Sequence, residues 1–382
     1  MDNFTMYNPT ALHFGKDIIQ KLGTVVKDYG RRVLLVYGKG SIKNNGIYDQ
    51  VMDQLRSAGA EVFEYAGIKP NPIVEDVDAA AKLGREKEVD VVLAVGGGSV
   101  IDSAKVISIT IPVQHSAWDF YSDKAKPVKA VPLIAVLTLA ATGTEMNMFA
   151  VIQNHKDGRK AGWGHKLMYP AHSLLDPSYT FSVPADYTAY GIADLIAHCL
   201  ENYFGKAEAS LTDRFIYSII AEAVENADGV LDEPLNYDYR ANIMYAATAA
   251  LNGLTSFGKG MGDWGVHSLG HVLSLLYDIP HGASLTIVYP AWMKFHQNIL
   301  DEKISKLGKA VFGSQNSEQA IADFETFFSS IGCPVKLQDA GIGVDKKEEI
   351  MRAMKHNRVQ GSIYKFTDAQ LENLLELMYS ES

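Results

Sequence analysis

The sequence lacks several features that mark particular classes of protein. Only two of its 382 residues are cysteines, Cys199 and Cys333, so a disulfide framework is excluded and a reducing compartment is expected. No run of about 18 apolar residues occurs, and the first residues do not place a basic segment before an apolar core, as a secretory signal would. We therefore expect a cytoplasmic protein that does not bind a membrane.

Positive charge is also scarce relative to negative charge. The formal net charge is -10, and no basic tract offsets it, so a nucleic-acid partner is not expected. Hydrophobic residues make up 47% of the chain and charged residues 21%, which is ordinary for a globular enzyme. A chain of this length is long enough for two domains.

Strands and helices alternate in the first half of the chain. This pattern predicts a Rossmann-like parallel sheet with helices on both faces, in a dinucleotide-binding α/β domain over residues 1–182. The segment 4–14 is expected to form a short hairpin. Four apolar runs have the length and composition of buried strands: 33–37, 61–65, 89–95 and 132–137.

Helical periodicity dominates the second half, where no segment is a convincing strand. We expect an all-helical domain over residues 183–382, joined to the first domain without a low-complexity linker.

Two segments of the helical half carry candidate metal ligands. His267 and His271 are spaced i, i+4, and Asp194 and His198 repeat that spacing, so on helices each pair lies on one face. A further histidine, His281, stands in a Pro-His-Gly turn. Imidazole suits zinc, iron, nickel and copper, but five ligands are one too many for a four-coordinate site with an open position. One histidine must have another role, and the alternative for each is an ordinary hydrogen-bonded histidine.

The turn Gly96-Gly97-Gly98-Ser99 stands between a predicted strand and a predicted helix. Its backbone N–H groups and the helix dipole could hold a pyrophosphate, although the turn does not match GxGxxG. A tight turn, with Ser99 as the helix N-cap and Asp102 completing a capping box, would explain the same residues.

A second glycine-rich turn, Gly38 to Ser41, bears on the choice of dinucleotide. An acidic residue at the end of such a strand would bind ribose hydroxyls and repel a 2′-phosphate, and none is present. Lys39 and Ser41 could instead hold that phosphate, and the alternative is a solvated lysine. The loop from Thr138 to Glu145 offers hydroxyl groups, as a loop near a ribose or nicotinamide would.

With these residues assembled, the chain resembles the iron-containing (group III) alcohol dehydrogenases, in the branch of bacterial butanol dehydrogenases and NADPH-dependent aldehyde reductases. The resemblance covers nearly the whole chain. Its most specific blocks are GIADLIAH at 191–198 and HSLGH followed by PHG at 267–282. The GGGS block is less discriminating, because relatives that form sugar-like rings or oxidise polyols share it.

The resemblance implies a role for each candidate. His271 matches the catalytic position that lines the substrate pocket and relays protons. NADP(H) is the implied cofactor, with NAD(H) as the alternative, because NAD-specific members commonly carry aspartate where Gly38 stands. The implied ligands of one Fe²⁺ or Zn²⁺ ion are Asp194, His198, His267 and His281. The residues implied around the dinucleotide are Gly38, Lys39, Ser41, Asn71, Gly97, Gly98, Ser99, Asp102, Thr138, Thr142, Phe149, Lys160 and Tyr179.

The implied function is metal-dependent hydride transfer between NADP(H) and a primary alcohol or aldehyde similar to butanol or butyraldehyde, in the cleft between the domains. The alternative is a metal-dependent lyase or ring-forming synthase of the dehydroquinate synthase type. Such an enzyme needs basic residues to hold an acidic substrate, and the ligand-bearing segments contain no Lys or Arg. A non-enzymatic sensor has little support, since no effector domain is visible. A homodimer is the family expectation.

Overall fold

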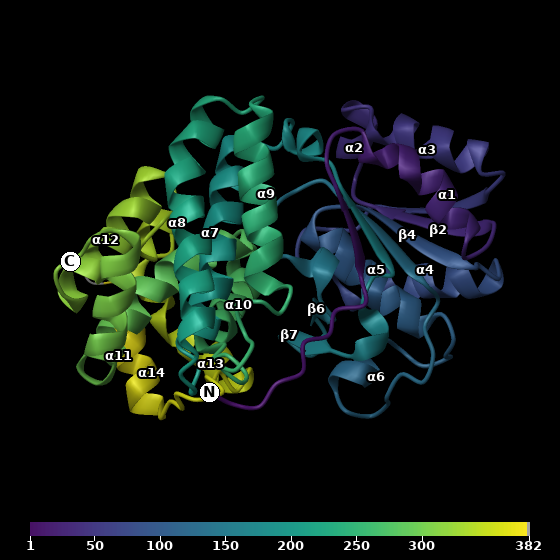
Figure 1. Ribbon diagram of the computed structural model, residues 1–382. Helices are drawn as coiled ribbons and strands as arrows, with labels where there is room; N and C mark the ends of the chain where they lie inside the picture. The colour runs from purple at the N-terminus through teal and green to yellow at the C-terminus, as the bar shows by residue number, and fades with distance from the viewer. Residues whose placement is uncertain (380–382) are drawn as a thin grey trace. The chain divides into compact units, whose positions relative to one another are not determined.

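The computed structural model describes residues 1–379, which form two compact units (Figure 1). One unit spans Tyr7–Val183, and the other combines Met1–Met6 with the chain from Pro184 onward. The sequence-based boundary lies between residues 182 and 183. The dinucleotide-binding and metal-binding roles assigned to the two halves stay predictions.

The unit from Tyr7 to Val183 contains a six-stranded, fully parallel sheet, which confirms the predicted fold class. Helices α1 and α3 lie on one face of the sheet and helices α4 and α5 on the other (Figure 1). The strands in spatial order are β1 (Ala11–Phe14), β8 (His172–Leu175), β5 (Leu133–Leu137), β4 (Val91–Gly96), β2 (Arg32–Tyr37) and β3 (Glu61–Ala66). The helices are α1 (Leu22–Lys27), α2 (Ser41–Asn44), α3 (Ile47–Ser57), α4 (Val74–Glu86), α5 (Gly98–Thr110) and α6 (Trp118–Tyr121).

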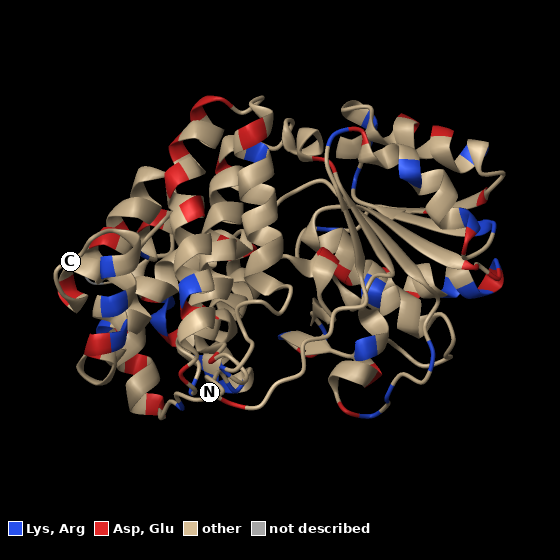
Figure 2. Cartoon of the chain, in the orientation of Figure 1, with Lys and Arg blue, Asp and Glu red and all other residues tan. Residues whose placement is uncertain are grey.

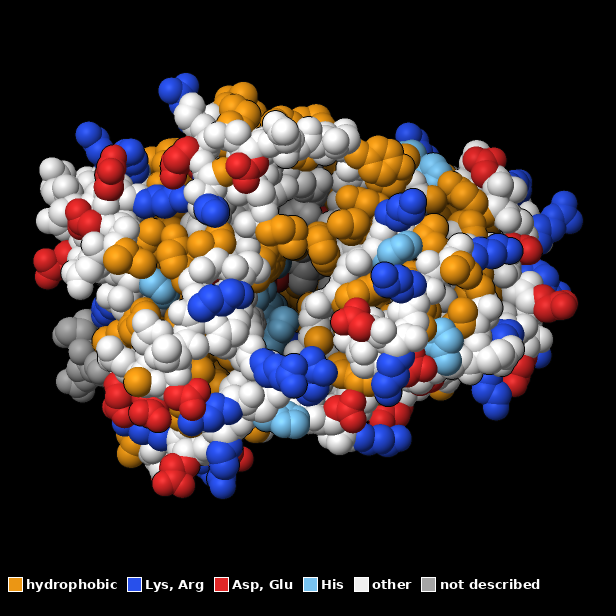
Figure 3. Space-filling model, turned by 90° about the horizontal axis from the view of Figure 1, so that it is seen from below, with side chains coloured by type: hydrophobic (Ala, Val, Ile, Leu, Met, Phe, Trp, Pro, Cys, Tyr) orange, Lys and Arg blue, Asp and Glu red, His pale blue; other side chains and the backbone are white. Residues whose placement is uncertain are grey.

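The central strands read as continuous apolar runs because helices cover both of their faces. Val33 and Leu35 of β2 pack into one core cluster with residues of α1 and α3. Leu34, between them, lies near Gly84 of α4 on the other face. In Figure 2 the strands are almost free of charged residues, which lie mainly on helices and loops. On the surface seen in Figure 3, acidic and basic side chains are interspersed with hydrophobic ones.

The order of the strands reverses direction at β2. Strand β3 lies on one side of β2 and β4 lies on the other. The chain therefore leaves the neighbouring strands β2 and β4 in opposite directions, toward β3 and toward β5. Ligands of open α/β sheets bind outside the carboxyl ends of the strands at such a point. Gly38 directly follows β2 and Gly97 directly follows β4, so the two predicted turns flank this position.

The first strand corrects one expectation. Residues 4–14 do not form a hairpin: only Ala11–Phe14 is a strand, and it pairs in parallel with β8 at the edge of the sheet. Its partner lies far along the chain, so no local pattern reveals the pairing. A hairpin occurs instead where β6 (Phe149–Asn154) pairs antiparallel with β7 (Arg159–Gly164). The mostly half-buried β7, which contains two glycines, lacks a clear alternating pattern.

The second unit is helical, and no strand occurs in its described residues, as predicted. Helix α7 is buried from Gly191 to its end, which makes it the centre of this unit. None of the helices in the described chain combines the length and apolar content needed to cross a membrane. The helices are α7 (Ala185–Tyr203), α8 (Ser210–Asp232), α9 (Tyr237–Leu251), α10 (Gly265–Tyr277), α11 (His281–Val311), α12 (Ser317–Ser330), α13 (Lys347–His356) and α14 (Asp368–Leu377).

A pair of histidines links β1 to β8. His13 Nε2 lies 3.0 Å from His172 Nδ1, and the rings stack with centroids 5.3 Å apart. Burial, the neighbouring His172 and Lys21 lower the pKa of His13. Burial also lowers the pKa of His172, against an opposing effect of Asp28, and the Tyr29 ring packs edge-on against it. The hydrogen bond needs one unprotonated ring nitrogen, so it is lost when both rings are charged.

We expect His172→Gln to make the stability of the protein less sensitive to mild acid. Both histidines have folded-state pKa values below the reference value of 6.5, so the unfolded chain binds more protons and the free energy of unfolding falls as the pH falls through this range. Between about pH 7 and about pH 5, the parent should lose on the order of 1 kcal/mol more than the variant. Urea unfolding at both pH values measures the difference. His356→Gln, at an exposed position, is the matched control, and an unchanged pH dependence in His172→Gln would contradict the expectation.

Candidate functional site

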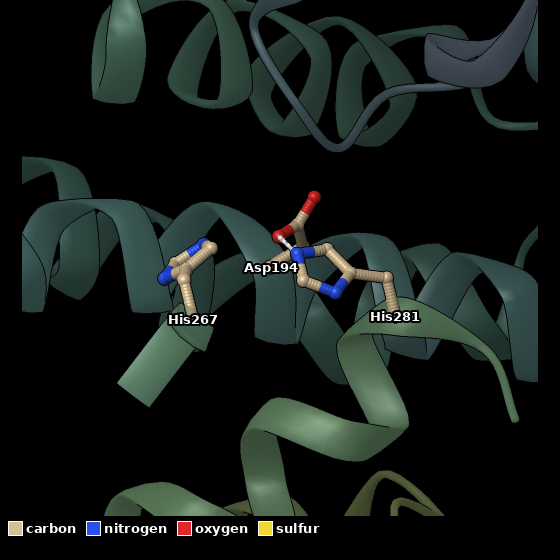
Figure 4. Close-up of side chains that lie close together, drawn as sticks. All are labelled: Asp194, His267 and His281. Carbon is tan, nitrogen blue, oxygen red and sulfur yellow. Dashed lines mark ion pairs between the residues drawn. The ribbon is translucent and has the colours of Figure 1, made fainter. Parts of the chain in front are cut away.

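Three side chains from three helices meet in the helical unit. Asp194 lies on α7, His267 on α10, and His281 is the first residue of α11. One potential ligand atom from each lies within 4.8 Å of the other two, and Figure 4 shows the three side chains gathered beside α7. His281 Nε2 lies 3.7 Å from Asp194 Oδ1. Two imidazoles and a carboxylate form a donor set that divalent ions accept, so this group could hold a metal ion.

The two remaining predicted histidines lie next to this group. His198 follows Asp194 by one turn of α7, and its Nε2 lies 3.7 Å from Asp194 Oδ1. Its ring stacks on that of His267 with centroids 4.9 Å apart, and burial together with His267 lowers the pKa of His198. The His271 ring lies 5.3 Å from the His281 ring and 6.4 Å from the His267 ring. The structure thus brings all five candidates together, while their separate roles stay predictions.

A close backbone contact seats the start of α11 against α7. A Cβ atom on Gly282 would lie 2.1 Å from the carbonyl oxygen of Tyr190, so no larger residue fits there without a shift. Further along α11, the Tyr289 hydroxyl donates to the carbonyl oxygen of Ala197 at 3.1 Å. These contacts place His281 against the face of α7 that carries Asp194.

Glu201 is a polar residue of this site that the sequence reasoning missed. Its buried carboxylate accepts the backbone N–H groups of Trp264 at 2.5 Å and His267 at 2.9 Å, and lies 2.8 Å from His267 Nδ1. Burial raises the pKa of Glu201 to about 8, and the backbone N–H groups of α10 act in the opposite direction. The signal in the sequence was the spacing, because Asp194, His198 and Glu201 stand at i, i+4 and i+7 on one helix face.

In the other unit, the alternative explanation of the first glycine-rich turn, a capping box of Ser99 and Asp102, is wrong. Helix α5 begins at Gly98 with Gly97 as its N-cap, so Ser99 lies inside the first turn. Asp102 accepts a hydrogen bond from the Thr144 hydroxyl at 2.5 Å and one from the Val151 N–H at 2.8 Å. The carboxylate therefore serves distant segments of the chain and does not cap its own helix.

The first glycine-rich turn touches the loop that follows β5. A Cβ atom on Gly98 would lie 2.7 Å from Thr142 Cγ2, and one on Gly97 would lie 3.1 Å from Leu139 Cβ. The Thr138 N–H donates to the carbonyl oxygen of Gly96 at 3.0 Å. The turn and the loop therefore lie side by side at the carboxyl ends of β4 and β5. Because the glycines have no side chains, they leave the backbone next to the N-terminus of α5 open to the close approach of a pyrophosphate.

The other predicted dinucleotide residues lie in three places within this unit. Lys160 Nζ donates to Asn71 Oδ1 at 2.7 Å, which joins β7 to the loop after β3. Lys39 and Ser41 are exposed where β2 leads into α2. Tyr179 is buried in the core cluster that includes β2 and α3, and its hydroxyl donates to Gln50 Oε1 at 2.8 Å.

Lys105 is a second residue that the sequence reasoning missed. It is fully buried on α5, and its ammonium group donates to Thr144 Oγ1 at 2.7 Å, to Asn147 Oδ1 at 2.9 Å and to the Phe149 carbonyl oxygen at 2.7 Å. Burial lowers the pKa of Lys105 to about 7, and Asp102 and Glu145 act against it. Together with Asp102, it ties the loop after β5 to α5 and so sets the position of Thr142 and Phe149.

Comparison with known proteins covers both units. Residues 9–177 match the family described as iron-containing alcohol dehydrogenase, and residues 188–379 match the C-terminal part of the Fe-containing alcohol dehydrogenase family. The chain is 39% identical over 387 residues to a probable NADH-dependent butanol dehydrogenase of Bacillus subtilis, with 99% of each chain covered. It is 39% identical over 352 residues to an NADPH-dependent aldehyde reductase of Escherichia coli, with 90% of each covered.

A solved structure gives a similar result. The NADH-dependent butanol dehydrogenase A of Thermotoga maritima superimposes with a TM-score of 0.96 at 37% identity, covering 100% of this chain and 99% of that one. The resemblance inferred from the motifs is confirmed, and these relatives do not favour the lyase alternative. The chain belongs to the iron-containing alcohol dehydrogenase family and is an oxidoreductase of the alcohol dehydrogenase type.

Proposed function

We propose that this protein transfers a hydride reversibly between NADP(H) and a primary alcohol or aldehyde of about the size of butanol or butyraldehyde. The observation that carries the proposal is the group of Asp194, His267 and His281 in a chain of this family. Two of the relatives are named as NADH-dependent butanol dehydrogenases and one as an NADPH-dependent aldehyde reductase. These names support the substrate class. They differ in the dinucleotide, so the choice of cofactor rests on this chain's own residues.

One divalent ion, iron or zinc, would be held by four side chains. The two ligands on α7 stand one turn apart, which lets one rigid helix present both to the same point. When bound, the ion supplies Lewis acidity that polarises a carbonyl oxygen. Three imidazoles and one carboxylate suit either metal. The proposed ligands are Asp194, His198, His267 and His281.

His271 would move the proton that accompanies hydride transfer. Reduction of an aldehyde consumes one hydride at the carbon and one proton at the oxygen. His271 is partly exposed, whereas His198 and His267 are buried, so His271 is the better placed of these three to exchange a proton with solvent. An imidazole can accept and release a proton near neutral pH, as such a relay requires.

The dinucleotide would bind at the carboxyl ends of β2, β4 and β5. The first turn of α5 offers backbone N–H groups to the pyrophosphate, and the loop carrying Thr138 and Thr142 offers hydroxyl groups beside it. The exposed Lys39 and Ser41 would hold a 2′-phosphate, for which Gly38 leaves room. We propose NADP(H) as the preferred cofactor on this basis.

A neutral substrate is supported by the lack of positive charge on two of the three helices that carry proposed ligands. Helices α7 and α10 contain no Lys or Arg, so they offer no cation to a phosphorylated or carboxylated substrate. The cytoplasmic location, the homodimer and the cleft between domains as the place of reaction stay predictions. The position of β1 at the edge of the sheet supports pairing between copies of the chain.

We expect metal removal and His267→Ala to have the same effect. Chelation should abolish NADPH oxidation with butyraldehyde, and iron or zinc should restore it. His267→Ala should lose the ion and at least about 100-fold in turnover, because a ligand to the metal is gone. Elemental analysis of anaerobically purified protein, beside the rate assay, measures both effects. His271→Ala is the matched control: it should keep the ion while slowing turnover by about 100-fold or more. Activity in metal-free protein would refute the proposal.

We expect Lys39→Ala to weaken NADPH binding by about tenfold, or about 1.4 kcal/mol, and to leave NADH binding within about twofold, because only NADPH carries the 2′-phosphate. Fluorescence titration with each dinucleotide gives both affinities. Lys43→Ala removes a neighbouring lysine that packs over the rings of Tyr37 and Tyr48, and it controls for a general loss of positive charge. An equal loss of affinity for NADPH and NADH in Lys39→Ala would show that Lys39 does not contact the 2′-phosphate.

We expect Gly98→Ala to weaken NADPH and NADH alike, by about tenfold. The added methyl group would lie 2.7 Å from Thr142 Cγ2 and would push the loop away from the turn. The same titrations measure this effect. Gly162→Ala is the matched control, since its methyl group would meet only Val151 Cγ2 at an ordinary 3.6 Å. Unchanged affinity in Gly98→Ala would show that the dinucleotide does not use this turn.

A further inference from the structure

We propose that Glu201 orients His267 toward the ligand group by accepting the hydrogen on its Nδ1, which leaves Nε2 to face an ion. The inference rests on the proposed function, because it assumes that a metal binds at Asp194, His267 and His281. Glu201 is thus assigned as a positioning residue that acts on the metal through His267.

The hydrogen bonds of the Glu201 carboxylate are the first evidence for this role. Oε2 accepts the Trp264 N–H at 2.5 Å, while Oε1 accepts the His267 N–H at 2.9 Å and lies 2.8 Å from His267 Nδ1. The backbone donors hold the carboxylate in place on both of its oxygens. Because both carboxylate oxygens already accept backbone N–H groups, the 2.8 Å contact is a hydrogen bond donated by Nδ1, which leaves the lone pair of the imidazole on Nε2.

The position of Glu201 on its helix is the second piece of evidence. It lies on α7 at i+7 from Asp194 and i+3 from His198, so one helix presents two proposed ligands and the carboxylate that orients a third. Only 2% of Glu201 is exposed, so water does not compete for the contact with the imidazole. Carboxylates that hold the second nitrogen of a metal-bound histidine fix its tautomer and raise its basicity.

The backbone at the start of α10 also supports the role of Glu201 in orienting His267. Trp264 is the N-cap of this helix and has a positive φ of 61°, a conformation that is strained for a bulky residue. Its ring lies 5.1 Å from the His267 ring and 6.2 Å from the His198 ring. Glu201 stabilises this cap through the Trp264 N–H. The strained turn and the carboxylate together determine where the His267 ring lies.

A purely structural role makes a different prediction, because a carboxylate at a helix N-terminus is stabilising in any case. Asp263 provides the comparison. It is buried beside the same helix end, and its carboxylate accepts the backbone N–H groups of Gly265 at 3.2 Å, Ile363 at 2.8 Å and Tyr364 at 2.8 Å. These bonds stabilise the backbone around α10, whereas Glu201 also contacts the imidazole. Asp263→Asn therefore controls for capping and stability.

The experiment compares zinc binding by the full-length parent, Glu201→Gln and Asp263→Asn. Each protein is stripped of metal and titrated with Zn²⁺ in competition with a coloured chelator, and Co²⁺ loading gives a visible spectrum of the ligand geometry. Glu201→Gln should bind Zn²⁺ about 10- to 100-fold more weakly than the parent and alter the Co²⁺ spectrum. Asp263→Asn should unfold at lower temperature, yet keep its zinc affinity within about threefold of the parent.

The outcomes distinguish the role of Glu201 from the metal site on which it rests. If the parent binds zinc and Glu201→Gln binds it equally well, this inference is wrong and the proposed metal site stands. An equal loss of affinity in both variants also overturns it, because helix capping would then explain the effect. A parent that binds neither Zn²⁺ nor Fe²⁺ would overturn the proposed function together with this inference.

A second measurement does not depend on the folding of any Glu201 variant. In metal-free parent protein labelled with ¹⁵N-histidine, the ring nitrogens of His267 report which one carries the hydrogen, and the spectrum of His267→Gln identifies them. We expect hydrogen on Nδ1 and none on Nε2. Hydrogen on Nε2 would overturn the inference.

Discussion

The buried carboxylate of Asp194 is the group on which the arrangement of the helical unit depends. An ionised carboxylate is costly to bury unless charges or hydrogen-bond donors balance it. His198 Nε2 and His281 Nε2 each lie 3.7 Å from its Oδ1. One of these histidines comes from the same helix and the other from the start of α11, so this cluster of a carboxylate and two imidazoles exists only where α7 and α11 pack closely. The contact of Gly282 with Tyr190 makes that packing possible.

Two further buried polar side chains have similar roles. Glu201 on α7 fixes the start of α10, which carries His267, and Lys105 on α5 fixes the loop that carries Thr142. In each case a hydrogen-bonding side chain on a buried helix determines the position of a segment that has little regular structure of its own. Removing such a side chain leaves its partners without hydrogen bonds, so it shifts the residues of the site as well as destabilising the fold.

Much of the fold follows from local patterns. The four apolar runs and the helical periodicity gave the parallel sheet and the helical half, because both patterns depend on neighbours within a few residues. The segment 4–14 was expected to be a hairpin because the parallel pairing of β1 with β8 joins distant parts of the chain, and β7 was missed because its residues do not alternate clearly between the two faces. The alternative in which Ser99 is the N-cap is wrong, because α5 already begins at Gly98, with Gly97 as its N-cap.

The sequence by itself determined the candidate residues and their helical spacing: Asp194 with His198, and His267 with His271, lie on common helix faces because the α-helix has a regular repeat. Only the tertiary structure decided which of these faces meet. It brought His281 to Asp194, the Glu201 carboxylate to the His267 imidazole, and Gly98 against Thr142. The reason is physical, since contacts between distant segments depend on how whole elements pack, and no local pattern of residues encodes that packing.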